Sequence, residues 1–135
     1  MQGEKDASQP RKTVCLVDDE VDIATVINRS LTQDGYIVHE FNDPNEAWEY
    51  FKTNGTNCTV VISDIRMYGM NGFDFCRRIK QLRPETPVIL MTAFETNLSE
   101  FSKVMPHTTP DGLMTKPISL IKLKEFIKEI TSKAK

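Results

Sequence analysis

Five residues that could hold a metal ion or a phosphoryl group stand where short apolar segments of this 135-residue chain end. They are Asp18 and Asp19 after TVCLV (13–17), Asp64 after CTVVIS (58–63), Thr92 closing PVILMT (87–92), and Lys116 after GLMT (112–115). Two carboxylates about 4 Å apart repel by roughly 4 kcal/mol at an effective dielectric constant of 20, so three together need a bound proton or a cation. Mg²⁺ prefers such all-oxygen sites with room for water. The acids therefore predict a magnesium site.

The lysine and the threonine fit phosphoryl chemistry beside that ion. The Lys116 ammonium can pair with one phosphoryl oxygen, and the Thr92 hydroxyl can donate to another. A cation keeps a neighbouring carboxylate ionised and therefore nucleophilic. Each residue alone is a weak signal, because an Asp-Asp pair after a strand is usually a turn or a helix cap. Their joint order and placement predict phosphoryl transfer.

The apolar segments predict the sheet that must position these residues. Three of them are continuous runs, as in strands buried on both faces of a parallel sheet, whereas YIVHEF (36–41) alternates like an outer strand. Segments of helical period lie between the strands. The alternation predicts a doubly wound α/β fold, with a five-stranded parallel sheet and helices on both faces. Ligands of such sheets bind at the carboxyl ends of the strands, where all five residues converge.

Four helices are predicted from caps and apolar spacing. One ends at Gly35, one begins at Asp43-Pro44, a third spans 73–82 and the last begins at Ser119. Their expected core faces are Ile23, Val26, Ile27 and Leu31; Ala47, Trp48 and Phe51; Phe75, Ile79 and Leu82; and Leu120, Leu123, Phe126, Ile127 and Ile130.

Length and composition predict a single cytoplasmic domain. The length suits one domain, here 13–135, behind a polar lead-in at 1–12 that we expect to be disordered. A net charge of -2 predicts no direct binding to nucleic acid or to an anionic membrane. Cys15, Cys58 and Cys76 form no CxxC motif and are expected as small buried side chains. No apolar stretch has the roughly 18 residues of a membrane span.

From residue 13 to about 132 the sequence resembles the receiver domain of two-component response regulators. The resemblance rests on VDDE, SDIRMYGMNG, MTAF and TKP in this order. It implies a flavodoxin-like fold with strand order 2-1-3-4-5. It also implies that Asp64 accepts a phosphoryl group from a sensor histidine kinase or a phosphotransfer protein, without the chain being a turnover enzyme. Asp19, Asp64 and the main-chain carbonyl of Arg66 would bind Mg²⁺, Asp18 would join through water, and Thr92 and Lys116 would hold the phosphoryl group.

Three departures from the family pattern bear on how a signal would leave the domain. Tyr68 stands where proline is common, and Leu113 replaces an aromatic residue that turns inward on activation. Without that ring, signal output must use another element or be weak. The segment 95–112 contains Pro106 and Pro110, which predict a short fourth helix within 96–104 followed by an irregular loop.

Other functions remain as alternatives. A phosphatase of the haloacid-dehalogenase type needs two aspartates spaced DxD after the first strand, and VDDEVD lacks that spacing. A flavin carrier on the same fold needs a loop rich in glycine and hydroxyl groups, where the acids of DDE would instead repel phosphate. A degenerate receiver that binds partners without phosphorylation would not need the complete acid set.

Overall fold

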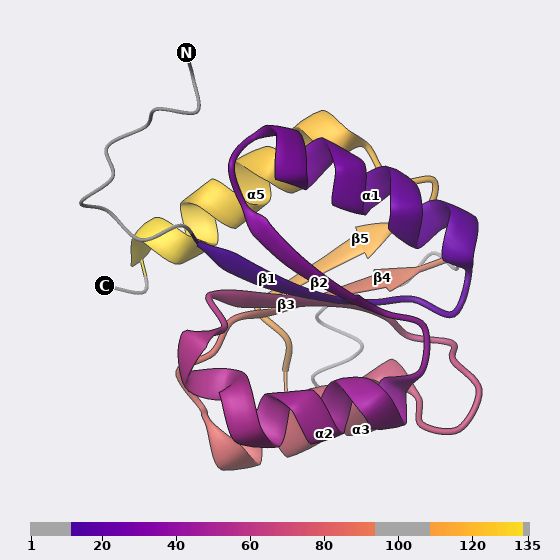
Figure 1. Ribbon diagram of the computed structural model, residues 1–135, viewed down its shortest axis with the longest axis vertical. Coiled ribbons are helices and arrows are strands. Elements are labelled where there is room, and N and C mark those ends of the chain that lie inside the picture. Colours follow the sequence, from indigo (N-terminus) through magenta and orange to yellow (C-terminus); the bar gives the residue numbers. More distant parts are fainter. Residues whose placement is uncertain (1–11, 94–108, 134–135) are drawn as a thin grey trace.

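A computed structural model describes residues 12–93 and 109–133 (Figure 1). Residues 1–11 of the expected lead-in lie outside this part of the chain, as do residues 94–108 with the expected fourth helix at 96–104. No helix of the described part has both the length and the apolar character needed to cross a membrane.

Five parallel strands form one sheet in the order β2-β1-β3-β4-β5, as the family resemblance implies. They are β1 (Thr13–Val17), β2 (Ile37–Phe41), β3 (Val60–Asp64), β4 (Val88–Thr92) and β5 (Gly112–Thr115). Strands β1, β3 and β4 are buried along their whole length, whereas the outer strand β2 is only partly buried. The difference between continuous and alternating apolar runs thus correctly separated the buried strands β1, β3 and β4 from the outer strand β2.

Helices cover both faces of the sheet. In Figure 1, α1 (Val21–Gln33) and α5 (Leu120–Lys133) lie on one face, and α2 (Pro44–Asn54) and α3 (Gly72–Leu82) lie on the other. A short 3-10 turn, η2 (Gly55–Asn57), follows α2. The predicted caps are present, because the Asp43 side chain accepts a hydrogen bond from the backbone nitrogen of Asn45, and Gly35 takes a positive φ of 96° after α1. The predicted end of α1 and the predicted start of α2 are therefore both present.

Successive residues of the central strands enter two separate hydrophobic clusters. Cys15, Val17, Val61 and Leu90 face α2 and α3, whereas their neighbours Val14, Leu16, Ile62 and Met91 face α1 and α5. All three cysteines are buried and unbridged, as expected. Because both faces are packed, the side chains that follow the last strand residues lie at the carboxyl-terminal edge of the sheet.

Three details differ from the sequence-based expectations. Strand β3 begins at Val60 instead of Cys58, because η2 delays the chain's entry into the sheet. Val26 and Leu82 were expected in the core but are 55% and 48% exposed. The apolar stripe of each helix is wider than its contact with the sheet, and Leu82 is the last residue of α3.

Candidate functional site

The predicted residues meet at the carboxyl ends of β1, β3, β4 and β5. Backbone hydrogen bonds fix their relative positions: the nitrogen of Lys116 donates to the carbonyl of Thr92 (2.7 Å), and that of Asp18 donates to the carbonyl of Phe41 (3.0 Å). All of them except the fully buried Asp18 line a pocket of about 230 Å³, whose walls are formed by Asp19, Glu20, Asp64, Arg66, Thr92, Ala93 and Lys116. The sheet thus brings together residues that are up to about a hundred positions apart in sequence.

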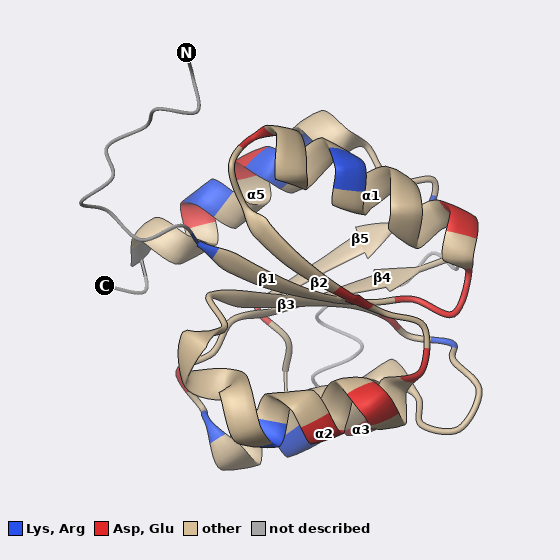
Figure 2. Ribbon diagram, viewed as in Figure 1, with Lys and Arg blue, Asp and Glu red and all other residues tan. Residues whose placement is uncertain are grey.

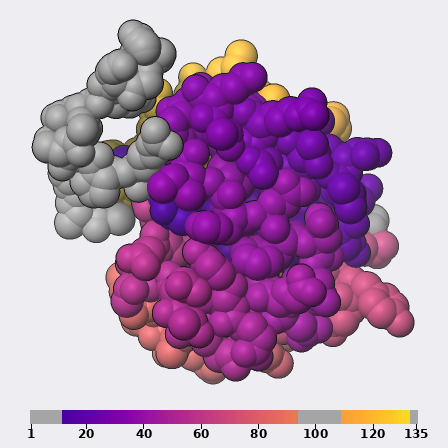
Figure 3. All heavy atoms as spheres, in the orientation of Figure 1, coloured from indigo at the N-terminus to yellow at the C-terminus, as the bar shows by residue number. Residues whose placement is uncertain are grey.

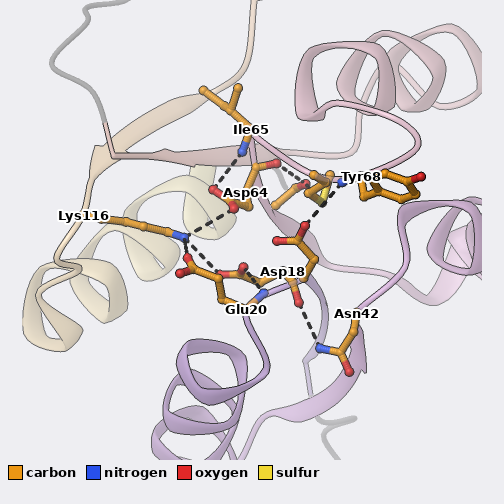
Figure 4. Close-up of polar contacts among 10 residues, drawn as sticks. Asp18, Glu20, Asn42, Asp64, Ile65, Tyr68 and Lys116 are labelled. Carbon is orange, nitrogen blue, oxygen red and sulfur yellow. Dashed lines mark hydrogen bonds and ion pairs between the residues drawn. The ribbon is translucent and has the colours of Figure 1, made fainter.

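Asp64 is the last residue of β3, and its side chain is 7% exposed at the floor of this pocket. The oxygen Oδ1 accepts a hydrogen bond from the backbone nitrogen of Ile65 (3.0 Å), while Oδ2 lies 3.3 Å from the Lys116 ammonium. Figure 4 shows both contacts. One oxygen is therefore fixed by the backbone, and the other faces the lysine.

Lys116 reaches into the pocket from the end of β5, and its side chain is only 11% exposed. Its Nζ lies 2.7 Å from Glu20, 3.3 Å from Asp64 and 3.4 Å from Asp18 (Figure 4). Burial alone would lower the pKa of Lys116, but the hydrogen bond to Glu20 and the charges of the three acids raise it above the ordinary value. The ammonium therefore stays charged and holds the carboxylates together.

One ammonium does not balance three carboxylates. Burial and the charge of Asp18 raise the pKa of Asp64 from 3.8 to about 6, although Lys116 and the backbone of Ile65 act in the opposite direction. Burial also raises the pKa of Asp18, which is fully buried. Negative charge thus exceeds positive charge at the pocket floor, a deficit that a divalent cation would remove.

The donor chemistry fits such a cation. One oxygen each of Asp18, Glu20 and Asp64 lies within 4.8 Å of the other two, and a set of carboxylate oxygens at an open pocket suits Mg²⁺. Figure 2 shows acidic residues on the segment that leads from β1 into α1. The described residues therefore offer a site for a hard divalent ion.

Asp19 occupies a different place from the other acids. It is exposed and lines the pocket, but it is not in the group of three, and its Oδ2 accepts a hydrogen bond from the backbone nitrogen of Tyr68 (3.3 Å). Tyr68 itself is 91% exposed, on the β3–α3 loop that stands out from the surface in Figure 3. Asp19 thus links the β1–α1 loop to the β3–α3 loop.

The structure adds Glu20, which the sequence analysis did not include among the site residues. Glu20 is the residue before α1, and its carboxylate makes the shortest contact to Lys116. The sequence contains a signal for it, since VDDE has three consecutive acids, but the family pattern assigns a role only to the first two. The remaining predicted residues, Arg66 and Thr92, both line the pocket.

Comparison with known proteins agrees with this geometry. The profile of the response regulator receiver domain family matches residues 14–128. Response regulator RppA of Synechocystis is 26% identical over 110 residues, which are 82% of this chain and 46% of RppA. The sensor kinase/phosphatase LuxN of Vibrio harveyi is 32% identical over 117 residues, 85% of this chain and 13% of LuxN. The chain thus spans less than half the length of either relative.

Solved receiver domains share the fold. The receiver domain protein of Methanospirillum hungatei superposes with a TM-score of 0.83 at 23% identity, covering 93% of this chain and 97% of that one. Response regulator TrrA of Thermotoga maritima, solved in complex with Mg(2+)-BeF, has a TM-score of 0.76 at 27% identity over 88% of this chain and 98% of TrrA. With the strand order, the acidic pocket and the profile match in agreement, this chain belongs to the response regulator receiver domain family.

Proposed function

We propose that Asp64 is the phosphoacceptor of this receiver domain and takes its phosphoryl group from a phosphohistidine of a sensor kinase or a phosphotransfer protein. The observation that carries the proposal is the placement of the Asp64 carboxylate at the pocket floor, with Oδ1 held by Ile65 and Oδ2 beside Lys116. Relatives such as LuxN, whose name is that of a sensor kinase/phosphatase, support a kinase as the partner.

In this reaction Oδ2 of Asp64 attacks the phosphorus atom. A new bond forms between Oδ2 and phosphorus as the bond between phosphorus and the histidine nitrogen breaks, and the imidazole leaves with the electron pair and takes a proton from solvent. Lys116 can pair with a phosphoryl oxygen from its present side of the pocket, and Thr92 can donate its hydroxyl to another. The chain gains a phosphoryl group and is not regenerated in the same step, so it acts as a switch and not as a turnover enzyme.

The same proposal assigns the cation to Asp18, Asp19, Asp64 and the main-chain carbonyl of Arg66. Burial and the charge of Asp18, which together raise the pKa of Asp64, and the Mg(2+)-BeF complex solved for TrrA support Mg²⁺ as the ion. When bound, Mg²⁺ would keep Asp64 ionised and offset the charge of the arriving phosphoryl group.

Three unbridged cysteines suit a reducing compartment, so we place the chain in the cytoplasm.

Incubation with acetyl phosphate and Mg²⁺, followed by intact mass measurement, tests the proposal. We expect one added phosphoryl group on the wild type, none on Asp64→Asn and none when a chelator removes the metal. Asp22→Asn is the matched control, because Asp22 is an exposed acid of the first turn of α1 outside the acid group. Labelling that persists in Asp64→Asn would move the acceptor elsewhere, and a wild type that is never labelled would favour a degenerate receiver.

A further inference from the structure

The side chain of Glu20 is paired with Lys116. It stands at the N-cap position of α1, where a short polar residue would normally accept a hydrogen bond from the helix backbone. Its side chain makes no such cap, and Oε1 lies instead 2.7 Å from Nζ of Lys116, across 96 positions of sequence. The contact is shorter than those of Lys116 to Asp18 and Asp64. The Glu20 carboxylate therefore acts on Lys116 and not on the start of α1.

The backbone of Glu20 is anchored to the same cluster. Its nitrogen donates to Oδ1 of Asp18 at 2.9 Å, and Asp18 is held from behind by the Asn42 side chain, which donates to the Asp18 carbonyl at 2.9 Å (Figure 4). The carboxylate of Glu20 can therefore hold the lysine in a defined place, because its own main chain is fixed to a fully buried residue. Glu20 itself is 57% exposed, so its contact with Lys116 can be broken without burying a lone charge.

These contacts place Lys116 between two competing partners. The ammonium touches Glu20 on the α1 side of the pocket and Asp64 on the β3 side. A phosphoryl group on Oδ2 of Asp64 would bring new negative oxygens to the β3 side and draw the ammonium toward them. Every interaction that Lys116 keeps with Glu20 in the unphosphorylated state must be weakened when that happens, so it opposes the reaction.

We propose that Glu20 is a positioning residue that retains the Lys116 ammonium on the α1 side of the pocket while Asp64 is unphosphorylated, and thereby restrains phosphorylation of Asp64. The proposal rests on the proposed function and adds a control to it. Because an ion pair with one exposed partner contributes about 0.2–1 kcal/mol, release of this restraint should raise the phosphorylation rate by about 1.5- to 5-fold. In this role Glu20 touches neither the phosphorus nor the acceptor oxygen and acts through Lys116, and because its carboxylate also lies in the acid group, its effect on the rate must be measured at saturating Mg²⁺.

Two measurements on Glu20→Gln, Glu20→Asp and Asp22→Asn test the restraint. The first is the hydrogen-exchange rate of the Lys116 ammonium, read by ¹⁵N NMR on metal-free protein without any phosphodonor. The second is the initial rate of labelling by acetyl phosphate, read by intact mass at a Mg²⁺ concentration that saturates each variant. Asp22→Asn removes the same unit of charge two residues away and so controls for the general effect of charge on donor and metal.

We expect Glu20→Gln to accelerate exchange of the Lys116 ammonium and to raise the labelling rate by the stated factor. Asp22→Asn should match the wild type in both measurements, and Glu20→Asp should restore part of the restraint. An unchanged Lys116 signal in Glu20→Gln would overturn the inference, and so would a labelling rate that is equal to or below that of Asp22→Asn. Failure of the proposed function has a different signature, because the wild type and all three variants would then remain unlabelled.

Discussion

Gly72 lies so close to the backbone of Asp64 that any side chain in its place would force the backbone to shift. A Cβ atom at Gly72 would stand 2.4 Å from the carbonyl oxygen of Asp64 and 2.8 Å from the α-carbon of Ile65. The nitrogen of Gly72 also donates to the carbonyl of Ile65 at 2.8 Å. The first residue of α3 is thus fastened to the end of β3, and the loop between them is closed at its base.

Gly72→Ala is therefore expected to destabilise the fold by about 1–3 kcal/mol, the usual cost of an overpacked side chain, because backbone and not a flexible side chain must move. Urea unfolding at equilibrium measures the loss. Gly55→Ala is the control, since its Cβ would meet the side chains of Phe51 and Arg83 at 3.0 to 3.2 Å, and side chains can shift. Equal stability of the two variants would contradict the argument.

The raised pKa of Asp64 predicts how stability depends on pH in the absence of divalent metal. The folded state binds the proton of this acid more tightly than the unfolded chain does, so its contribution is complete below about pH 4 and is lost as the pH rises to about 6. A pKa that is about two above 3.8 corresponds to at most roughly 3 kcal/mol. Asp64→Asn should therefore be more stable than the wild type at pH 7.5.

Urea unfolding at pH 4 and pH 7.5 with a chelator present checks this prediction. The stability difference between Asp64→Asn and the wild type should grow by up to about 3 kcal/mol between the two values. Carboxylates that do not interact with Asp64 titrate alike in both proteins and cancel in this difference. A difference that is the same at both pH values would show that the charge of Asp64 is fully compensated in the metal-free fold.

The same excess of negative charge predicts that Mg²⁺ stabilises the folded chain. An ion that binds only the folded state adds about 2.7 kcal/mol when its concentration is one hundred times the Kd. The melting temperature, followed by circular dichroism, should therefore rise with Mg²⁺ in the wild type and in Asp22→Asn. It should rise less in Asp19→Asn and Asp64→Asn, and an equal rise in all four proteins would place the ion elsewhere.

Much of this arrangement was predictable because short local sequence patterns mark the strands and their ends. Strand β5 spans the predicted 112–115, since a run such as GLMT is bounded by Gly112 and by the Lys116-Pro117 step. Strand order came from the family resemblance, because local apolar patterns do not specify which strands pair. The convergence of Asp64 and Lys116 followed from the rule that parallel strands end at one edge.

What the sequence did not reveal depends on where a side chain points. Glu20 reads as an ordinary acid at the start of a helix, and only the fold shows that its carboxylate turns away from the helix toward Lys116. Val26 likewise follows the helical spacing of its core neighbours, yet it lies 55% exposed because α1 contacts the sheet along a narrower stripe. Periodicity gives the face of a helix but not the width of its contact.

Lys116→Met tests whether one ammonium holds the acid group together. Methionine keeps most of the aliphatic length of lysine but leaves the buried carboxylates of Asp18 and Asp64 without their cation. Removing one member of a buried ion pair costs up to about 3–5 kcal/mol, and we expect about 3 kcal/mol or less, because the third acid, Glu20, is exposed. The loss should be larger at pH 7.5 than at pH 5, since the carboxylate of Asp64 can take up a proton at the lower value.

Urea unfolding with a chelator at both pH values measures this loss of stability, and Lys116→Arg, which keeps the charge, is the control. A methionine variant as stable as the arginine variant at pH 7.5 would mean that the three carboxylates do not need the ammonium to coexist in the fold.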